Sequence, residues 1–316
     1  RIKTFTIGFE EDKFNESKEA SIISKTIGTE HTGIILNKKE LNNSLKDVVL
    51  AWDEPFADVS KIPTLLLSKI TSKEVKVALS GDGSDELFGG YKRYKQSIII
   101  RQIFKYYAPL VENLLNSNKF GKSNKFIDFK LKQRISRLLF LIRESNEKSY
   151  YTKFMWFSHN YKNIINEHSS DKNFDNYYVK NDFLSMTNED LTNYLPNNIL
   201  TKIDRSSMFF GLEARCPYLD HELVDWILNL KKNQRFFPLN NKYILKTILS
   251  EYIPKQIIQK KKKGFSIPLS KWLRTHLKEW AKHYIMDESC YGHKLIDQEK
   301  VRILWDEHQN KINEWH

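Results

Sequence analysis

The residues whose types and spacing point most directly to chemistry lie in one short segment. Residues 77–91 read VALSGDGSDELFGGY, so an apolar run is followed by a loop with four glycines and the three acids Asp82, Asp85 and Glu86. Glycines allow a tight turn that exposes backbone N–H groups, and carboxylates can hold Mg²⁺ together with phosphate oxygens. The segment therefore predicts a nucleotide and metal site. A solvated turn is the alternative, whereas a calcium loop is disfavoured because its alternating acids and terminal glutamate are missing.

This loop needs a strand before it, and the first part of the chain supplies alternating strands and helices. Apolar periodicity predicts strands at residues 3–9, 31–36 and 75–79, and helices at residues 15–28, 39–52 and 63–70. Such alternation is typical of a parallel sheet in a layered α/β unit. Ligands of parallel sheets bind at the carboxyl ends of the strands, so we expect residues 80–85 at such an end.

The rest of the chain has helical periodicity and predicts no further strand. Residues 92–193 are rich in aromatic residues, lysine and asparagine, and we expect helices with polar connections there. Helices are also predicted at residues 199–210, 222–230, 242–252 and 272–285. We divide the chain into an α/β nucleotide-binding part (1–94), a variable helical insertion (95–193) and a C-terminal helical part (194–316).

Composition narrows the class of protein. With 40% apolar and 13% aromatic residues, the chain of 316 residues can bury a sizeable core and is not disordered. Its net charge of +12 attracts polyanions, but the lysines are scattered, which favours a solvated basic surface over a nucleic-acid footprint. Cys216 and Cys290 have neither disulfide nor zinc spacing, and no window of about 18 apolar residues exists. We therefore predict a cytoplasmic protein without a membrane span.

Segment 79–91 resembles the second nucleotide signature of the glutamine-dependent asparagine synthetase family. Four further segments match that family in order and approximate spacing: LPNNILTKIDRSSM at 195–208, GLEARCPYLDH at 211–221, NKYILK at 241–246 and KKGFSIPL at 262–269. The resemblance runs from residue 4 to about residue 280 and is weak between residues 96 and 188. A set of five ordered motifs is highly specific.

This resemblance implies a fold and a reaction. The fold is an adenine-nucleotide α-hydrolase-like parallel sheet, followed by a mostly helical part that completes the synthetase active site. The reaction is ATP-dependent adenylation of the β-carboxylate of aspartate with Mg²⁺, followed by attack of ammonia to give asparagine, AMP and pyrophosphate. The resemblance also implies a glutaminase domain as the source of ammonia and is compatible with a homodimer.

Two alternatives stay open beside this reaction. A related amidotransferase-like ligase would act on another carboxylate, such as a sugar acid or a peptide or antibiotic precursor. A basic nucleic-acid-binding or interaction protein would keep the fold without catalysis. The presence of Asp82, Asp85 and Lys242 together argues against the second alternative.

The resemblance assigns roles to individual residues. Lys242 matches the catalytic lysine that reaches the phosphates, and Asp85 would bind Mg²⁺ with the pyrophosphate oxygens. Asp82 stands where the best-known members carry a glutamate that manages protons, which leaves the acceptor carboxylate open. The residues expected to line the nucleotide are Ile7, Ser80 and Gly81.

Other charged segments carry structural expectations. We favour Glu86 as an acid at the start of a helix over a role as a partner of the site. Glu213 and Arg215 are expected to join an ion pair under the active site, with a buried structural pair as the alternative. Segment 204–207 fits a cap or a salt bridge as well as a substrate contact, and residues 262–264 suggest a basic lid over the phosphates.

Two features of the family are missing from the sequence. No Ser-Gly-Gly-x-Asp-Ser phosphate loop occurs in it, and the glutaminase domain with its nucleophilic cysteine is absent. The resemblance therefore implies that Arg1 lies inside a domain and that a core strand is missing. We expect the polypeptide as given to be catalytically incompetent.

Overall fold

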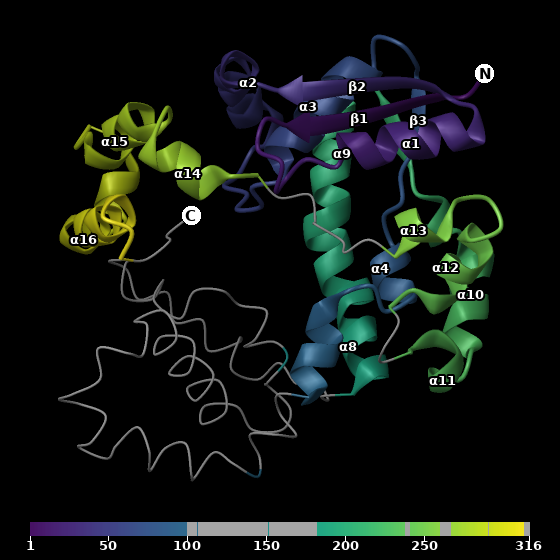
Figure 1. The fold of residues 1–316 in the computed structure, drawn as a ribbon. Coiled ribbons are helices and arrows are strands. Elements are labelled where there is room, and N and C mark those ends of the chain that lie inside the picture. The colour runs from purple at the N-terminus through teal and green to yellow at the C-terminus, as the bar shows by residue number, and fades with distance from the viewer. Residues whose placement is uncertain are drawn as a thin grey trace, which may run out of the picture.

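The computed structural model describes residues 1–99, 106, 151, 182–237, 241–259, 267–289 and 291–312 (Figure 1). The expected lid at residues 262–264, Cys290 and most of the predicted insertion at residues 95–193 lie outside this described part. The division of the chain at residues 94 and 193 therefore stays a prediction.

Two parallel strands and the helix between them form the first α/β unit (Figure 1). β1 (Lys3–Phe9) pairs with β2 (Glu30–Leu36) in one continuous register. The connecting helix α1 (Ser17–Ile27) ends at Gly28, whose φ of 74° is readily adopted only by a residue without Cβ. The strands predicted at residues 3–9 and 31–36 and the helix predicted at 15–28 are confirmed to within two residues.

Two further helices, α2 (Lys38–Ala51) and α3 (Lys61–Thr71), confirm the helices predicted at residues 39–52 and 63–70. At the start of α2, the Asn37 side chain accepts from the Glu40 N–H, and the Glu40 side chain accepts from the Asn37 N–H. This capping box satisfies N–H groups that a helix start otherwise leaves without partners. These helices, the first sheet and a C-terminal segment enclose the main core, which includes Ile7, Phe9, Leu36, Leu41, Trp52, Leu65, Trp272 and Leu277.

A second two-stranded sheet precedes the candidate site. β3 (Val77–Leu79) pairs in parallel with β4 (Glu213–Arg215), which comes from the second half of the chain. The structure corrects two expectations here. The described strands form two separate sheets rather than one layer, and the strand predicted at residues 75–79 is shorter. The sequence does not predict β4, because Glu-Ala-Arg lacks the apolar alternation that is typical of strands.

Helices dominate the described chain after β3. They are α4 (Ser84–Leu87), α8 (Phe183–Glu189), η3 (Asp190–Leu200), α9 (Thr201–Met208), η4 (Pro217–Leu219), α10 (His221–Asn229), α11 (Lys232–Arg235), α12 (Tyr243–Leu249), α13 (Lys255–Ile258), α14 (Leu269–Arg274), α15 (Lys278–Met286), η5 (Tyr291–Lys294) and α16 (Gln298–Gln309). In Figure 1, α10 to α13 gather on one side of α9, while α14 to α16 lie together on the other side.

Two of the predicted helices have different bounds. The helix predicted at residues 199–210 begins earlier, because α8, η3 and α9 follow one another without a break. The η3 segment is a π-helix around Pro196, whose ring nitrogen has no hydrogen to donate. The helix predicted at residues 272–285 is divided into α14 and α15, since Thr275 has a non-helical φ of −124° and ψ of −107°.

A buried ion pair joins α9 to the segment before α3. Lys202 Nζ lies 2.8 Å from Asp58 Oδ2 and donates to Ser60 Oγ at 2.7 Å. The two charged side chains are only 10% and 18% exposed. Burial acts to raise the pKa of Asp58, but the Lys202 charge and the hydrogen bonds from Lys202 and Ser60 outweigh it and lower that pKa. Asp58 is therefore stabilised in its charged form although its carboxylate is largely buried from solvent.

Removal of Lys202 should destabilise the protein strongly. Lys202→Ala is expected to lower the free energy of unfolding by about 3 kcal/mol, because Asp58 is then buried without its cation. Arg205→Ala is the matched control on the same helix: the Arg205 pair with Asp53, at 2.7 Å, is exposed and should contribute below about 1 kcal/mol. Urea unfolding of both variants measures the difference, and equal losses would contradict this account.

Candidate functional site

The loop that follows β3 carries the predicted nucleotide residues. The Ser80 N–H donates to the Arg215 carbonyl at 2.8 Å, which extends the β3–β4 ladder by one residue. The Ser80 hydroxyl donates to Asp82 Oδ2, and the Asp82 N–H donates back to Ser80 Oγ at 3.3 Å. The expectation that residues 80–85 lie at the carboxyl end of a strand is confirmed.

Lys242 reaches the same loop from a distant part of the chain. Its Nζ lies 3.0 Å from Asp85 Oδ1 and donates to Ser84 Oγ at 2.9 Å. Lys242 directly precedes α12, and its φ of 56° lies in the left-handed region that residues with a Cβ rarely adopt. Its N–H donates to the Phe88 carbonyl at 3.3 Å, so the backbone and the side chain are both tied to this region. Backbone strain of this kind concentrates at functional sites.

A glycine allows the contact between Asp85 and Lys242. A Cβ at Gly90 would lie 1.8 Å from Asp85 Oδ1 and 2.3 Å from Lys242 Cε, which is too close for either atom. The Gly90 N–H donates to the Asp85 carbonyl at 2.8 Å, and the Asn241 side chain donates to the Gly90 carbonyl at 3.1 Å. The side chains of Asp85 and Lys242 thus pack directly against the Gly90 backbone.

Five of the predicted site residues share this region, and the sixth lies apart from it. The five are Ser80, Gly81, Asp82, Asp85 and Lys242. Ile7 lies in the other sheet, and its side chain is buried in the main core, so its role in lining the nucleotide stays a prediction. The expected pair of Glu213 and Arg215 exists at 2.7 Å, but both side chains are exposed on β4. The pairing is therefore confirmed and the buried alternative is wrong, whereas a place under the active site stays a prediction.

Cys216, for which the sequence predicts no role at the site, lies beside Ser80 of the loop. Its Sγ is 3.7 Å from Ser80 Oγ. Burial raises the pKa of the Cys216 thiol, and the charge of Asp82 acts in the same direction. The thiol is therefore a packing neighbour of the loop rather than an activated nucleophile.

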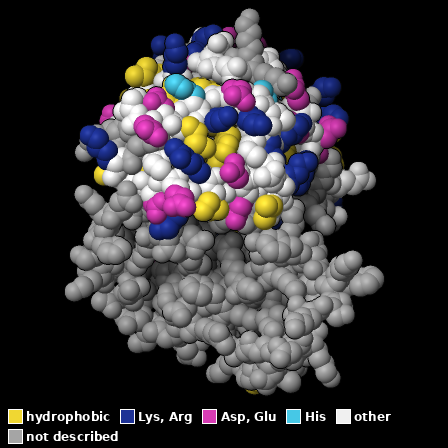
Figure 2. All heavy atoms as spheres, turned by 90° about the vertical axis from the view of Figure 1, so that its left-hand side faces the viewer, with side chains coloured by type: hydrophobic (Ala, Val, Ile, Leu, Met, Phe, Trp, Pro, Cys, Tyr) yellow, Lys and Arg dark blue, Asp and Glu magenta, His cyan; other side chains and the backbone are white. Residues whose placement is uncertain are grey.

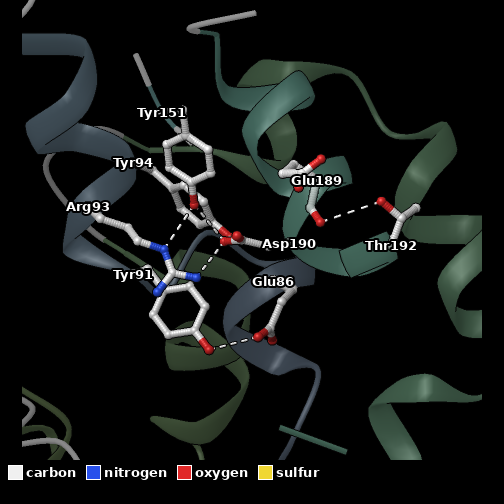
Figure 3. A network of polar contacts seen from close by, with 8 residues as sticks. All are labelled: Glu86, Tyr91, Arg93, Tyr94, Tyr151, Glu189, Asp190 and Thr192. Carbon is white, nitrogen blue, oxygen red and sulfur yellow. Dashed lines mark hydrogen bonds and ion pairs between the residues drawn. The ribbon is translucent and has the colours of Figure 1, made fainter. Parts of the chain in front are cut away.

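A buried polar network lies beside these residues (Figure 3). Glu86, in the first turn of α4, is 1% exposed and accepts from the Tyr91 hydroxyl at 2.7 Å. Burial raises the pKa values of both Glu86 and Tyr91. The preferred helix-start position of Glu86 is confirmed, and its carboxyl group is in addition a buried hydrogen-bond partner of Tyr91.

Asp190 of η3 holds the other end of this network (Figure 3). Its Oδ2 accepts from three donors, which are Arg93 Nη2 at 2.6 Å, Tyr94 Oη at 2.5 Å and Tyr151 Oη at 2.8 Å. The Arg93 guanidinium lies 3.7 Å from the centroid of the Tyr91 ring. The sequence does not predict this network, because Arg93 and Asp190 are 97 positions apart. The local signal is the aromatic and basic run YKRY at residues 91–94, which begins at the last residue of the nucleotide signature.

A cavity of about 210 Å³ opens at the carboxyl ends of β1 and β2. Glu10, Glu11, Lys271 and His276 contribute to its lining, and Lys271 donates to Glu11 at 2.9 Å. This ion pair joins α14 to the end of β1. On the side of the molecule where α14 to α16 lie, basic and acidic side chains are interspersed (Figure 2). That mixture fits a solvated surface better than a nucleic-acid footprint.

Asp85 is suited to a nucleotide-bound metal ion. Among the described residues, no group of three or more His, Cys, Asp and Glu side chains is placed to hold a metal ion by itself. Mg²⁺ on a nucleotide needs only one or two carboxylates, because phosphate oxygens and water complete its shell. A single carboxylate beside a lysine and a glycine loop fits that requirement.

No described helix is long and apolar enough to cross a bilayer.

Comparison with known proteins decides the family. The family model described as asparagine synthase matches residues 1–316, which is the whole chain. This protein belongs to the asparagine synthase family. The family that the ordered motifs suggested is thereby confirmed. Both Lys242 and the loop that follows β3 lie inside the matched region.

Curated relatives align with nearly the whole chain. Asparagine synthetase (glutamine-hydrolyzing) 1 of Bacillus subtilis is 28% identical over 305 residues, which cover 93% of this chain and 47% of that protein. Asparagine synthetase (glutamine-hydrolyzing) 3 of the same species is 24% identical over 323 residues, with 96% and 46% covered. Amidase chyE of Penicillium rubens is 22% identical over 322 residues, with 94% and 48% covered. The chain spans about half the length of the curated relatives it matches.

Proposed function

We propose that this chain is the synthetase part of an ATP-dependent amide ligase, which adenylates the β-carboxylate of aspartate and then transfers the acyl group to ammonia. One observation carries the proposal. Lys242, Asp85 and the glycine loop meet at the carboxyl end of β3, in a chain of the asparagine synthase family. Phosphates bind at this edge of parallel sheets.

The proposed reaction has two steps. A carboxylate oxygen first forms a bond to the α-phosphorus of ATP while the bond to pyrophosphate breaks, which leaves an acyl-adenylate. The nitrogen lone pair of ammonia then forms a bond to the acyl carbon, AMP leaves with the bonding electrons, and the nitrogen loses a proton. Both steps place negative charge on phosphate oxygens, so a fixed cation is the stabiliser that the site needs.

Lys242 supplies that cation. Asp85 and Ser84 hold its ammonium group at the loop, so little reorganisation is needed when charge develops on a phosphate. Asp85 would hold Mg²⁺ together with phosphate oxygens, and that ion, when bound, neutralises part of the phosphate charge. Ser80 and Gly81 lie in the loop that leads from β3 to Asp85, where their backbone can line the nucleotide.

Asp82 is the group placed for proton transfer. Its Oδ2 accepts from the Ser80 hydroxyl, whereas its Oδ1 has no hydrogen-bond partner among the described residues. We assign to Asp82 the proton that ammonia loses as the amide forms. The ammonia itself would come from glutamine hydrolysis elsewhere in the natural protein, because the Bacillus relatives are named glutamine-hydrolyzing and are about twice as long as this chain.

A second candidate is a ligase of the same mechanism that acts on a different carboxylate. Two observations favour keeping it. Asp82 is one methylene shorter than the glutamate of the best-known members, and a relative that matches 94% of the chain is named an amidase. The nucleotide chemistry would be unchanged, and only the acceptor would differ.

The products distinguish this chemistry from phosphoryl transfer. The protein at its natural length, given ATP, Mg²⁺, ammonia and aspartate, should form pyrophosphate and AMP in equal amounts, because the α-phosphorus is attacked. Chromatography of the nucleotides and an enzymatic pyrophosphate assay measure this. ADP with orthophosphate would rule the adenylation out, and a product only with carboxylates other than aspartate would select the second candidate.

A further inference from the structure

Two hydrogen bonds brace the turn that supports the Asp85–Lys242 pair. The Gly90 N–H donates to the Asp85 carbonyl at 2.8 Å, and the Tyr91 hydroxyl donates to Glu86 Oε1 at 2.7 Å. The second bond joins Tyr91, at the end of segment 85–91, to Glu86 in the first turn of α4. Gly90, against which the pair packs, lies between the two ends of this brace.

Tyr91 is itself clamped from outside the turn (Figure 3). The Arg93 guanidinium lies over its ring, and the ring of Tyr194 packs edge-on at 6.1 Å between centroids. Arg93 is fixed in turn by Asp190 at 2.6 Å and by the Tyr151 hydroxyl at 2.9 Å. Buried networks that are fully satisfied in this way are rigid. The clamp therefore limits how far the Tyr91 ring can move.

We propose that Tyr91 is a positioning residue, which holds Gly90 against Asp85 and Lys242 through its hydrogen bond to Glu86 and its clamped ring. Neither Tyr91 nor Asp190 needs to touch a substrate in this arrangement. Asp190 of η3 holds Arg93, and Arg93 holds the Tyr91 ring, so segment 85–91 is restrained by contacts with η3. This restraint fixes the position of the Lys242 ammonium group. The kinetic form of this inference rests on the proposed function, whereas the placement of Lys242 does not.

Tyr91→Phe is the variant that isolates the brace. It removes only the hydroxyl and keeps the ring under Arg93. We expect the kcat for pyrophosphate formation to fall about tenfold, with the KM for ATP changed by less than about twofold, as the loss of one buried hydrogen bond predicts. In a Lys242→Ala background the same substitution should have almost no effect on kcat, because the group that the brace positions is gone.

A second measurement needs no activity. Limited acylation with mass spectrometry should show Lys242 labelled severalfold faster in Tyr91→Phe than in the parent protein, with Lys278 on α15 as the internal reference. Glu86→Gln keeps an oxygen that accepts from Tyr91 and should leave the labelling of Lys242 close to normal, whereas Glu86→Leu should raise it. Tyr284→Phe, at an exposed tyrosine of α15, is the control and should change nothing.

The outcomes separate the two proposals. If the parent protein forms no pyrophosphate, the proposed function fails while the labelling still tests the brace. If Tyr91→Phe leaves the labelling of Lys242 unchanged, or lowers kcat by the same factor with and without Lys242, the network only stabilises the fold and the inference is overturned. Thermal unfolding of each variant shows that the proteins compared are folded.

Discussion

Lys242→Ala is expected to reduce the kcat for pyrophosphate formation by about 10²–10³, with a much smaller change in the affinity for ATP. The substitution removes the cation that Asp85 and Ser84 hold at the loop. Charge on the phosphate oxygens grows as the α-phosphorus is attacked, so the lost interaction is stronger in the transition state than in the ground state. Single-turnover kinetics together with ATP titration in the protein at its natural length measure the two effects separately.

Two further variants make this result specific. Lys242→Arg should restore little activity, because a planar guanidinium cannot take the place of a compact ammonium group beside Gly90. Lys246→Ala, one turn further along α12, should be nearly silent. Near-normal adenylation in Lys242→Ala combined with complete loss in Lys246→Ala would mean that the catalytic lysine is assigned one turn too early.

Gly90→Ala should abolish most of the activity without any change of charge. Its Cβ would lie 1.8 Å from Asp85 Oδ1 and 2.3 Å from Lys242 Cε, so the acid and the lysine must separate or the turn must shift. A displacement of about 1 Å at a reacting centre costs on the order of 10²-fold in rate. The expected result is a loss of about that size, measured as kcat for pyrophosphate formation.

Gly292→Ala is the matched control for this substitution. A Cβ at Gly292 would meet no atom within 4 Å, and the residue lies in η5, outside the site. It should leave both activity and stability unchanged. Retention of full activity in Gly90→Ala would show that the contact between Asp85 and Lys242 is not needed for the reaction.

The sequence predicts those parts of the fold whose signals are local. β1 is recognised because apolar residues recur at every second position of KTFTIGF, and the loop after β3 is recognised because GDGSD combines glycines with acids. β4 has no such signal. Its residues Glu213 and Arg215 are exposed, and only pairing with β3 makes them a strand. Partners that are distant in the chain decide this element, and a single sequence does not show them.

The same difference separates the predicted site residues from the missed ones. Asp85 and Lys242 are found because each lies in a recognisable motif. Asp190 is found only in the structure, because its partners Arg93 and Tyr151 acquire a role through burial rather than through spacing. Glu86 shows the intermediate case. Its place at a helix start is readable in the sequence, whereas its buried bond to Tyr91 is not.

The pairing of β3 with β4 has a consequence for the order of folding. Ser80 and Cys216, which flank the ends of the two strands, are 136 positions apart, so the pairing closes a very long loop. Closing a loop of that length costs about 4 kcal/mol of chain entropy beyond a constant term. Contacts of such high sequence separation form late, after local helices have appeared. The nucleotide loop is therefore assembled among the last elements, and a ligand that bridges the loop and Lys242 would delay the local opening of the strands that carry it.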